Sequence, residues 1–189
     1  MSMEEPERAD MREALKRVAV SLKQSGIPFA LIGGCAVWAR GGPESAHDVD
    51  FMVAEEDAPS AAAWLAAEGF QVVQPPEDWL FKVFTDGSMV DVIHRDAGVP
   101  ATRAVVEDVD EIEVLSVQMP VLTATELVVH KLMAMDEHVC DFGRQLPVAR
   151  ALREQVDWQR VRKETEPSAY AAAFLFLLEQ LSIIDPEDA

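Results

Sequence analysis

Apolar residues in the first two thirds of the chain follow both a helical and a strand-like pattern. From residue 7 to residue 25 they recur every three or four positions, which is the spacing of an amphipathic helix that ends at Gly26. Short apolar runs typical of buried strands follow at residues 28–32, 48–53 and 70–73, with helices predicted between them at 33–39 and 60–68. The alternation predicts a sheet that is flanked by helices.

A β-hairpin is predicted in the middle of the chain. Residues 80–85 and 88–94 flank Asp86-Gly87, a dipeptide that favours the two-residue turn between antiparallel strands. Residues 111–117 alternate between apolar and polar positions, so we expect one further strand there.

The last third of the chain has only helical patterns. Thr123-Ala124-Thr125-Glu126 has the spacing of a capping box, in which Thr123 accepts from a first-turn amide and Glu126 reaches back. Helices are predicted at residues 123–138, 142–154, 158–163 and 168–182. We therefore expect an α+β fold, with a small mixed-sheet lobe and its flanking helices over residues 1–122 and a helical lobe over residues 123–189.

Composition and charge narrow the class of protein. The chain has 189 residues and a formal net charge of -18, which speaks against non-specific binding to nucleic acid. Residues 131–163 are the only segment that leans basic, and they form either solvated helix faces or a wall that faces phosphate. The sequence lacks an apolar run of the roughly 18 residues that a membrane span needs. Its polar start is unlike a secretory signal, so we expect a cytoplasmic protein with no membrane partner.

Two aspartates at the start of a predicted strand are the main candidates for chemistry. Asp48 and Asp50 alternate with apolar residues, so they face the same side of the strand, where their repulsion would be relieved by a shared divalent cation. Asp91 lies between apolar neighbours on the second hairpin strand. If the two strands are adjacent, the three carboxylates form a cage for two Mg²⁺ ions. Alternatively, Asp48 caps a turn and Asp50 pairs with an arginine.

A glycine pair precedes these aspartates. Gly33-Gly34 separates a predicted strand from a predicted short helix. Such a pair lets backbone amides approach an anion and directs the positive end of the helix dipole toward phosphate, although many strand-to-helix turns use glycine simply to fit.

These residues resemble the nucleotidyltransferase fold of the DNA polymerase β superfamily. Its signature is an apolar residue, Gly, Gly or Ser, about a dozen residues, and then Asp-apolar-Asp-apolar. Here Ile32-Gly33-Gly34 and Asp48-Val49-Asp50-Phe51 match it, and Asp91 stands for the third carboxylate. Residues 127–132, which end in His130-Lys131-Leu132, look like a motif of the AbiEii-like branch, and Asp141 lies where a following helix supplies a further Asp. That branch contains toxins of type IV toxin-antitoxin systems, and related members modify aminoglycoside or lincosamide antibiotics.

The resemblance implies a role for each of these residues. Asp48 and Asp50 would hold the Mg²⁺ or Mn²⁺ that bridges the nucleotide phosphates, and Asp91 would complete a second metal site and help activate the acceptor hydroxyl. The nucleotide would be bound by Gly33, Gly34, Lys131 and Asp141, with Lys131 reaching the triphosphate as a catalytic residue. The alternatives are a lysine that extends to solvent from a helix and an aspartate that caps one.

Three residues depart from the family pattern. Cys35 follows the glycine pair where many members place a serine near the turn, and Glu44 and Ala46 stand where members often carry Arg and Thr. The changes affect the contacts expected with the nucleotide and leave the predicted metal cage intact.

The sequence thus favours a Mg²⁺-dependent enzyme that moves a nucleoside monophosphate from an NTP to a hydroxyl acceptor. The basic segment favours an RNA acceptor such as the tRNA 3′ end, which would make the protein a toxin with an antitoxin partner. The overall acidity favours a small cationic acceptor such as an aminoglycoside. A catalytically silent binding module of the same fold is the alternative from another functional class.

Overall fold

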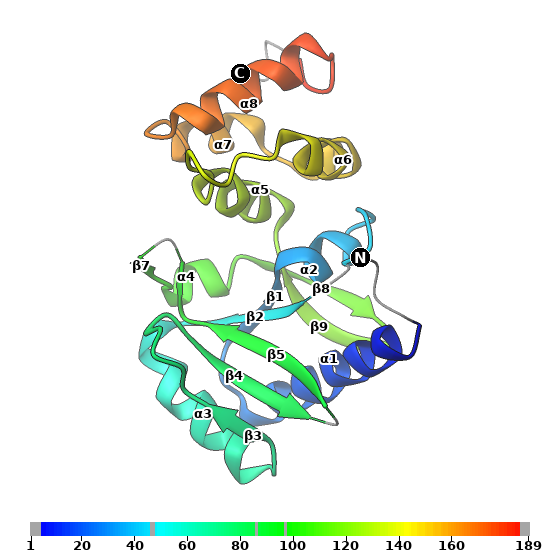
Figure 1. Cartoon of the computed structure of the whole chain (residues 1–189), viewed down its shortest axis with the longest axis vertical. Coiled ribbons are helices and arrows are strands. Elements are labelled where there is room, and N and C mark those ends of the chain that lie inside the picture. The colour runs from blue at the N-terminus through cyan, green and yellow to red at the C-terminus, as the bar shows by residue number, and fades with distance from the viewer. Residues whose placement is uncertain (1–4, 46–47, 86, 97, 186–189) are drawn as a thin grey trace.

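A mixed sheet forms the centre of the protein. The computed structural model describes residues 5–45, 48–85, 87–96 and 98–185, so Ala46 and Asp86 lie outside the described residues. Within those ranges the chain forms a seven-stranded sheet in the order β3-β4-β5-β2-β1-β9-β8 and a two-stranded ribbon, β6-β7 (Figure 1). The strands are β1 (Phe29–Ile32), β2 (Val49–Val53), β3 (Gln71–Val73), β4 (Leu80–Thr85), β5 (Ser88–Ile93), β6 (Arg95–Asp96), β7 (Val99–Pro100), β8 (Val109–Val114) and β9 (Val117–Leu122).

Helices form layers on the sheet and at one end of the molecule. Helices α1 and α3 lie against the sheet, and α5 to α8 gather at the opposite end (Figure 1). The helices are α1 (Glu5–Ser25), α2 (Gly33–Ala39), α3 (Ala58–Ala67), α4 (Arg103–Val106), α5 (Ala124–Met133), α6 (Phe142–Leu152), α7 (Trp158–Glu164) and α8 (Ala169–Gln180), with 3-10 turns at Glu55–Asp57 and Arg153–Gln155. Among the described residues, no helix is long and apolar enough to cross a membrane.

Buried apolar side chains form two clusters. The first joins the inner face of α1, including Leu15 and Leu22, to the sheet, and the second joins α5 to α8 around Phe174. Helix α5 contributes to both, because Leu127 belongs to the first cluster and Leu132 to the second. The predicted lobe boundary between residues 122 and 123 falls between β9 and α5 and stays a prediction.

The strand predicted at residues 111–117 is confirmed over residues 111–114 of β8, but the turn and second strand that follow were not predicted. The chain forms a hairpin, in which β8 pairs antiparallel with β9, and β9 continues the sheet by lying parallel to β1. The turn is made by Leu115 and Ser116, whose φ angles are +52° and +66°. Because neither residue is the Gly, Asn or Asp that favours a positive φ and Pro120 interrupts the strand pattern, the sequence carries no strong hairpin signal here.

The remaining predicted elements lie close to their expected positions. The hairpin of β4 and β5 is confirmed, as are the helix at α1 and the short helix at α2. Helix α5 ends at Met133, earlier than predicted. Helix α4 and the β6-β7 ribbon were not predicted, because elements of two to four residues are too short for a periodic pattern.

Half of the predicted capping box is confirmed. Thr123 caps α5, since its Oγ1 accepts from the amide of Glu126 at 3.4 Å. The carboxylate of Glu126 does not close the box, because it forms an ion pair with Arg160, while the amide of Thr123 donates to the carbonyl of Asp108 at 3.1 Å. Glu126 therefore links α5 to α7.

The strained turn between β8 and β9 gives a testable prediction for stability. Ser116→Gly should raise the free energy of unfolding by about 0.5–1 kcal/mol, because glycine adopts a positive φ without the steric cost that serine meets. The control is Ala63→Gly on the exposed face in the middle of α3, which should lower the free energy of unfolding by a similar amount. Urea unfolding of the three proteins tests this, and a loss of stability in Ser116→Gly would contradict it.

Candidate active site

Charged residues form a row across neighbouring strands on one face of the sheet. Asp50 on β2 is the register partner of Asp91 on the parallel strand β5, and Asp91 is the partner of Lys82 on the antiparallel strand β4. Side chains of register partners share a face, so these three residues project together. Their strand neighbours Val49 and Val92 are buried in the core. The expectation that the Asp91 strand lies beside the Asp48-Asp50 strand is confirmed.

The glycine pair leaves room for two side chains of the site. Gly33 has a φ of +66°, and a Cβ atom placed on it would lie 2.2 Å from Oδ2 of Asp50. A Cβ atom on Gly34 would lie 2.6 Å from Oγ of Ser45. Both positions therefore require glycine for close approach, and the group that approaches Gly33 is the Asp50 carboxylate itself.

Two side chains hold the backbone at Asp48. Ser45 Oγ donates to the carbonyl of Asp48 at 3.2 Å, and Cys35 Sγ donates to the same carbonyl at 3.4 Å. Burial raises the pKa of the Cys35 thiol to about 12, so Cys35 remains a protonated donor at neutral pH. Ser45 could not be singled out from the sequence, because only the folded loop brings its hydroxyl to the carbonyl of Asp48.

The environment of Asp50 is electrostatically unfavourable for a carboxylate. Burial raises its pKa to about 6, with further increases from the charges of Asp48 and Asp91, while Lys131 and Lys82 partly offset the shift. Burial lowers the pKa of Lys131, and the negative charge of Asp50 opposes that decrease. Asp50 and Lys131 thus stabilise each other's charged form.

Two cavities meet at Asp50 and Lys131, which line both of them. The first, of about 340 Å³, has a mostly polar wall that contains Gly34, Ser45, Asp48 and Arg144. The second, of about 190 Å³, has a largely apolar wall formed by Ile32, Gly33, Ile93, Asp96, Leu122, Leu127, His130 and Ala134. The structure therefore gathers Gly33, Gly34, Asp48, Asp50 and Lys131, all five singled out from the sequence, around adjoining spaces.

Asp91 and Asp141 line neither cavity. Oδ1 of Asp91 lies 2.9 Å from Nζ of Lys82 in an ion pair. Asp141 caps α6, where Oδ1 accepts from the amide of Arg144 at 3.1 Å, and its carboxylate also pairs with the guanidinium of Arg144 at 3.3 Å. At this end of α6, Arg144 rather than Asp141 reaches the first cavity.

The predicted cage of three carboxylates is not formed. Among the residues that the structure describes, no three or more His, Cys, Asp or Glu side chains are grouped so that they could hold a metal ion. Asp91 instead pairs with Lys82. Asp48 and Asp50 still suit a hard divalent cation, because both carboxylates offer oxygen ligands to the first cavity. The two negative charges also repel each other, and a bound cation would relieve that repulsion.

Glu44 stands on the first cavity but its charge is neutralised. The carboxylate forms an ion pair with Arg12 and a longer one with Arg8, at 3.7 Å, both from α1. Where the resemblance leads us to expect a basic residue, the chain thus carries a glutamate whose charge is balanced by two arginines of α1.

His130 belongs to a network that sequence reasoning missed. Its Nδ1 pairs with Asp96 of β6, and its Nε2 lies 3.5 Å from Oε2 of Glu126, which in turn pairs with Arg160. The spacing of Glu126 and His130, four residues apart on one helix, was the available signal. Because Asp96 comes from an unpredicted ribbon, the sequence could not join it to His130.

The basic segment is mostly engaged in ion pairs within the chain. Arg160 pairs with Asp108 and Glu164, each at 2.7 Å, in addition to Glu126. Arg162 pairs with Glu179, and Arg153 pairs with Glu154 at 2.9 Å. This agrees with the interpretation of the segment as helix faces better than with a continuous wall that faces phosphate.

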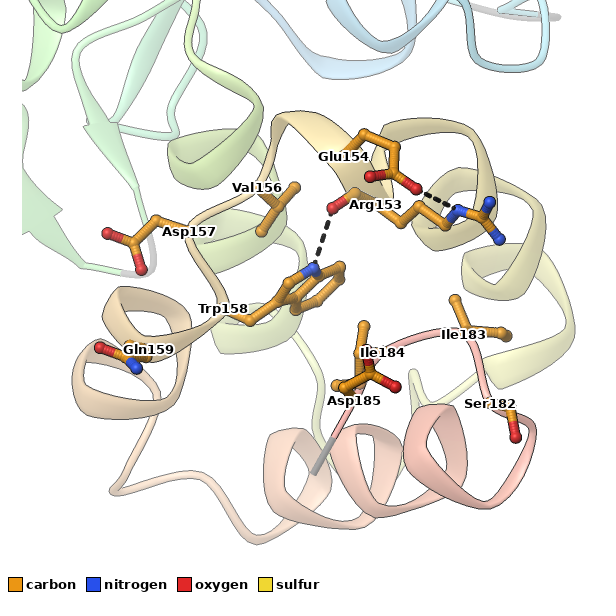
Figure 2. A pocket seen from close by; sticks show the side chains of 10 residues that line it. All are labelled: Arg153, Glu154, Val156, Asp157, Trp158, Gln159, Ser182, Ile183, Ile184 and Asp185. Carbon is orange, nitrogen blue, oxygen red and sulfur yellow. Dashed lines mark hydrogen bonds and ion pairs between the residues drawn. The ribbon is translucent and has the colours of Figure 1, made fainter. Parts of the chain in front are cut away.

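A larger cavity, of about 490 Å³, lies among the helices away from the carboxylates. Figure 2 shows Trp158 on its wall, with the indole nitrogen donating to the carbonyl of Arg153 at 3.0 Å. Two of the three acidic residues on its wall have local partners, since Asp157 caps α7 and Glu154 pairs with Arg153. This cavity contains none of the residues that the sequence singled out for chemistry, and its cation, Arg153, is paired with Glu154.

The raised pKa of Asp50 predicts a pH-dependent gain in stability for Asp50→Asn without added metal. The folded state binds the Asp50 proton more tightly than the unfolded state, so ionisation destabilises the fold as the pH rises through about 6. At pH 8 the substitution should raise the free energy of unfolding by an amount on the order of 2 kcal/mol, and the gain should vanish near pH 4.

Urea unfolding at the two pH values measures this difference. The control is Asp10→Asn on the exposed face of α1, which should change stability by less than about 0.5 kcal/mol at either pH. An effect of Asp50→Asn that does not change with pH would contradict the prediction.

Comparisons with solved structures find the same fold. ANT(2'')-Ia in complex with adenylyl-2''-tobramycin aligns with a TM-score of 0.59 at 13% identity, over 88% of this chain and 97% of that chain. An antigenic nucleotidyltransferase-like protein from Paracoccidioides brasiliensis aligns with a TM-score of 0.53 at 12% identity, over 92% and 88% of the two chains. The predicted α+β nucleotidyltransferase fold, with a mixed sheet and helices, is confirmed.

Sequence comparison identifies the family. No curated protein matches the chain. The family model described as "Uncharacterised nucleotidyltransferase" matches residues 4–183, whereas no comparison shows the AbiEii-like branch. Because that match spans nearly the whole chain, the protein belongs to this nucleotidyltransferase family.

Proposed function

We propose that the protein transfers a nucleoside monophosphate from an NTP to a hydroxyl acceptor, with pyrophosphate as the second product. The observation that carries the proposal is that two cavities share Asp50 and Lys131 as a common wall. Nucleotidyl transfer requires two substrates to meet at one phosphorus atom, so adjoining spaces with charged groups between them suit this reaction.

The residues of the first cavity suit a metal-bound triphosphate. Asp48 and Asp50 would hold the divalent cation, Mg²⁺ or Mn²⁺, which when bound neutralises phosphate charge and polarises the phosphorus centre. Lys131 would place its ammonium group against the phosphates, and Arg144 at the rim would bind their outer oxygens. Ser45 and Cys35 hold the Asp48 backbone in place for this task.

The negative charge of Asp50 also explains why Lys131 is suited to this position. In the absence of a nucleotide the lysine stabilises Asp50, and burial makes its ammonium group less well hydrated. A phosphate group that enters the cavity therefore meets a cation that has already lost part of its water.

A small cationic acceptor fits the charge of the protein best. The chain has a formal net charge of -18, and the helical lobe uses Arg153, Arg160 and Arg162 in internal ion pairs. A hydroxyl-rich polycation would be attracted to such a surface, whereas an RNA backbone would be repelled. ANT(2'')-Ia, which shares the fold, is seen with an adenylylated aminoglycoside, and this supports the same class of acceptor.

The tRNA 3′ end is the second candidate acceptor. Arg144 on the wall of the first cavity has a side chain that is 83% exposed, and Arg150 is exposed further along α6. These residues could contact a phosphate backbone. This acceptor would place the protein with the AbiEii-like toxins, with an antitoxin as its partner, in the cytoplasm.

Transfer of label from each of the four α-labelled NTPs tests the proposal. The purified protein with Mg²⁺ is offered an aminoglycoside panel in one reaction and total tRNA in another, and we expect labelled aminoglycoside. Asp48→Asn and Asp50→Asn should each lower the rate by at least about a hundredfold, because each removes an anionic ligand of the divalent cation.

Asp157→Asn, which removes a negative charge remote from Asp50 but keeps an oxygen that can cap α7, is the matched control and should retain the wild-type rate within about twofold. If tRNA is labelled instead of an aminoglycoside, the acceptor is the tRNA 3′ end. A protein that labels neither acceptor and shows no Mg²⁺-dependent NTP binding would be a binding module, and the proposed reaction would be wrong.

A further inference from the structure

Lys82 pairs with Asp91 on the side of the row that faces away from Asp50. Its Nζ lies 2.9 Å from Oδ1 of Asp91, and the side chains of the two residues are only 28% and 16% exposed. Half-buried ion pairs of this kind are less screened by solvent than surface pairs and hold their geometry better. The Lys82 ammonium also lies 3.5 Å from the sulfur of Met89, so it is held on two sides.

The sheet itself fixes this pairing. Asp50, Asp91 and Lys82 are register partners on three successive strands, β2, β5 and β4. Adjacent strands are separated by about 4.8 Å, so Asp91 lies between a carboxylate on one side and an ammonium group on the other. Lys82 stays opposite Asp91 whatever its side-chain rotamer, because the β4-β5 register sets the position of its backbone.

The charges divide into two sets. Asp91 is balanced by Lys82, whereas Asp48 and Asp50 face the first cavity with Lys131 as the nearby cation. In keeping with this division, no group of three potential ligands is assembled within the described part of the chain. Asp48 and Asp50, whose charges are not balanced, suit one divalent ion. Asp91 is already paired with Lys82, so it has no free charge to offer a second ion.

We propose that Lys82 takes the place of a second metal ion, so that the protein binds one divalent cation, at Asp48 and Asp50, and uses a fixed ammonium group at Asp91. This inference rests on the proposed function for the role of the bound ion. Lys82 is a positioning residue: it holds the Asp91 carboxylate on the β4 side of the row and away from the ion.

The number of bound ions tests the inference without reference to activity. Isothermal titration of the purified protein with Mn²⁺ should give one site for the wild-type chain. Asp50→Asn should weaken that site by at least about tenfold, whereas Asp91→Asn should leave its affinity unchanged within about twofold.

Substitution of the lysine should create the second site. Lys82→Met keeps the apolar stem and frees Asp91, so it should bind two Mn²⁺ ions, while the charge-preserving control Lys82→Arg should bind one. Lys82→Met/Asp91→Asn removes both members of the pair and should again bind one. This double variant leaves no unpaired charge in the sheet, so it also reports on the site if Lys82→Met alone folds poorly.

Two results would overturn the inference. The first is two Mn²⁺ sites in the wild-type chain, or none, and the second is a loss of at least about tenfold in Mn²⁺ affinity on Asp91→Asn. Either result leaves the label-transfer experiment to decide the proposed function independently, since an enzyme with two ions could still transfer the nucleotide. Conversely, if the protein binds one Mn²⁺ ion but labels no acceptor, the inference about Lys82 stands and the proposed transfer reaction is wrong.

Discussion

The repulsion that Asp50 experiences is the constraint on which the rest of the site depends. Its carboxylate is partly buried, and the charges of Asp48 and Asp91 act on it from neighbouring positions. A fold tolerates such a group only when cations lie nearby, and here Lys131 approaches from α5 while Lys82 pairs with Asp91. The helical layer is therefore joined to the sheet by charge as well as by the apolar contacts of Leu127.

The local backbone serves the same carboxylate. Gly33 has no side chain because Oδ2 of Asp50 occupies the space in which a Cβ atom would lie. Ser45 and Cys35 hold the carbonyl of Asp48, so the loop before β2 is fixed next to the cavity. Strand, glycine turn and loop together keep two carboxylates facing one space, and that arrangement stores an electrostatic cost that a bound cation would relieve.

The sequence predicts the elements with strong periodic or turn signals and the residues attached to them. Asp48, Asp50 and the glycine pair could be singled out because they interrupt apolar runs at a regular spacing. The β8-β9 hairpin could not be predicted, since Leu115 and Ser116 adopt positive φ angles although neither is a Gly, Asn or Asp. Two ion pairs between residues on different elements could not be predicted either. The pairing of Lys82 with Asp91 depends on the strand register, and the pairing of His130 with Asp96 depends on an unpredicted ribbon.

The most direct test of the account is to locate the bound ion. A crystal of the protein grown with Mn²⁺ and a non-hydrolysable NTP analogue gives the ion's position from its anomalous scattering. The account predicts one peak between Asp48 and Asp50, with the triphosphate beside Lys131 in the first cavity and Lys82 still paired with Asp91. A peak that is bound by Asp91, or a nucleotide that lies away from Asp50, would contradict it.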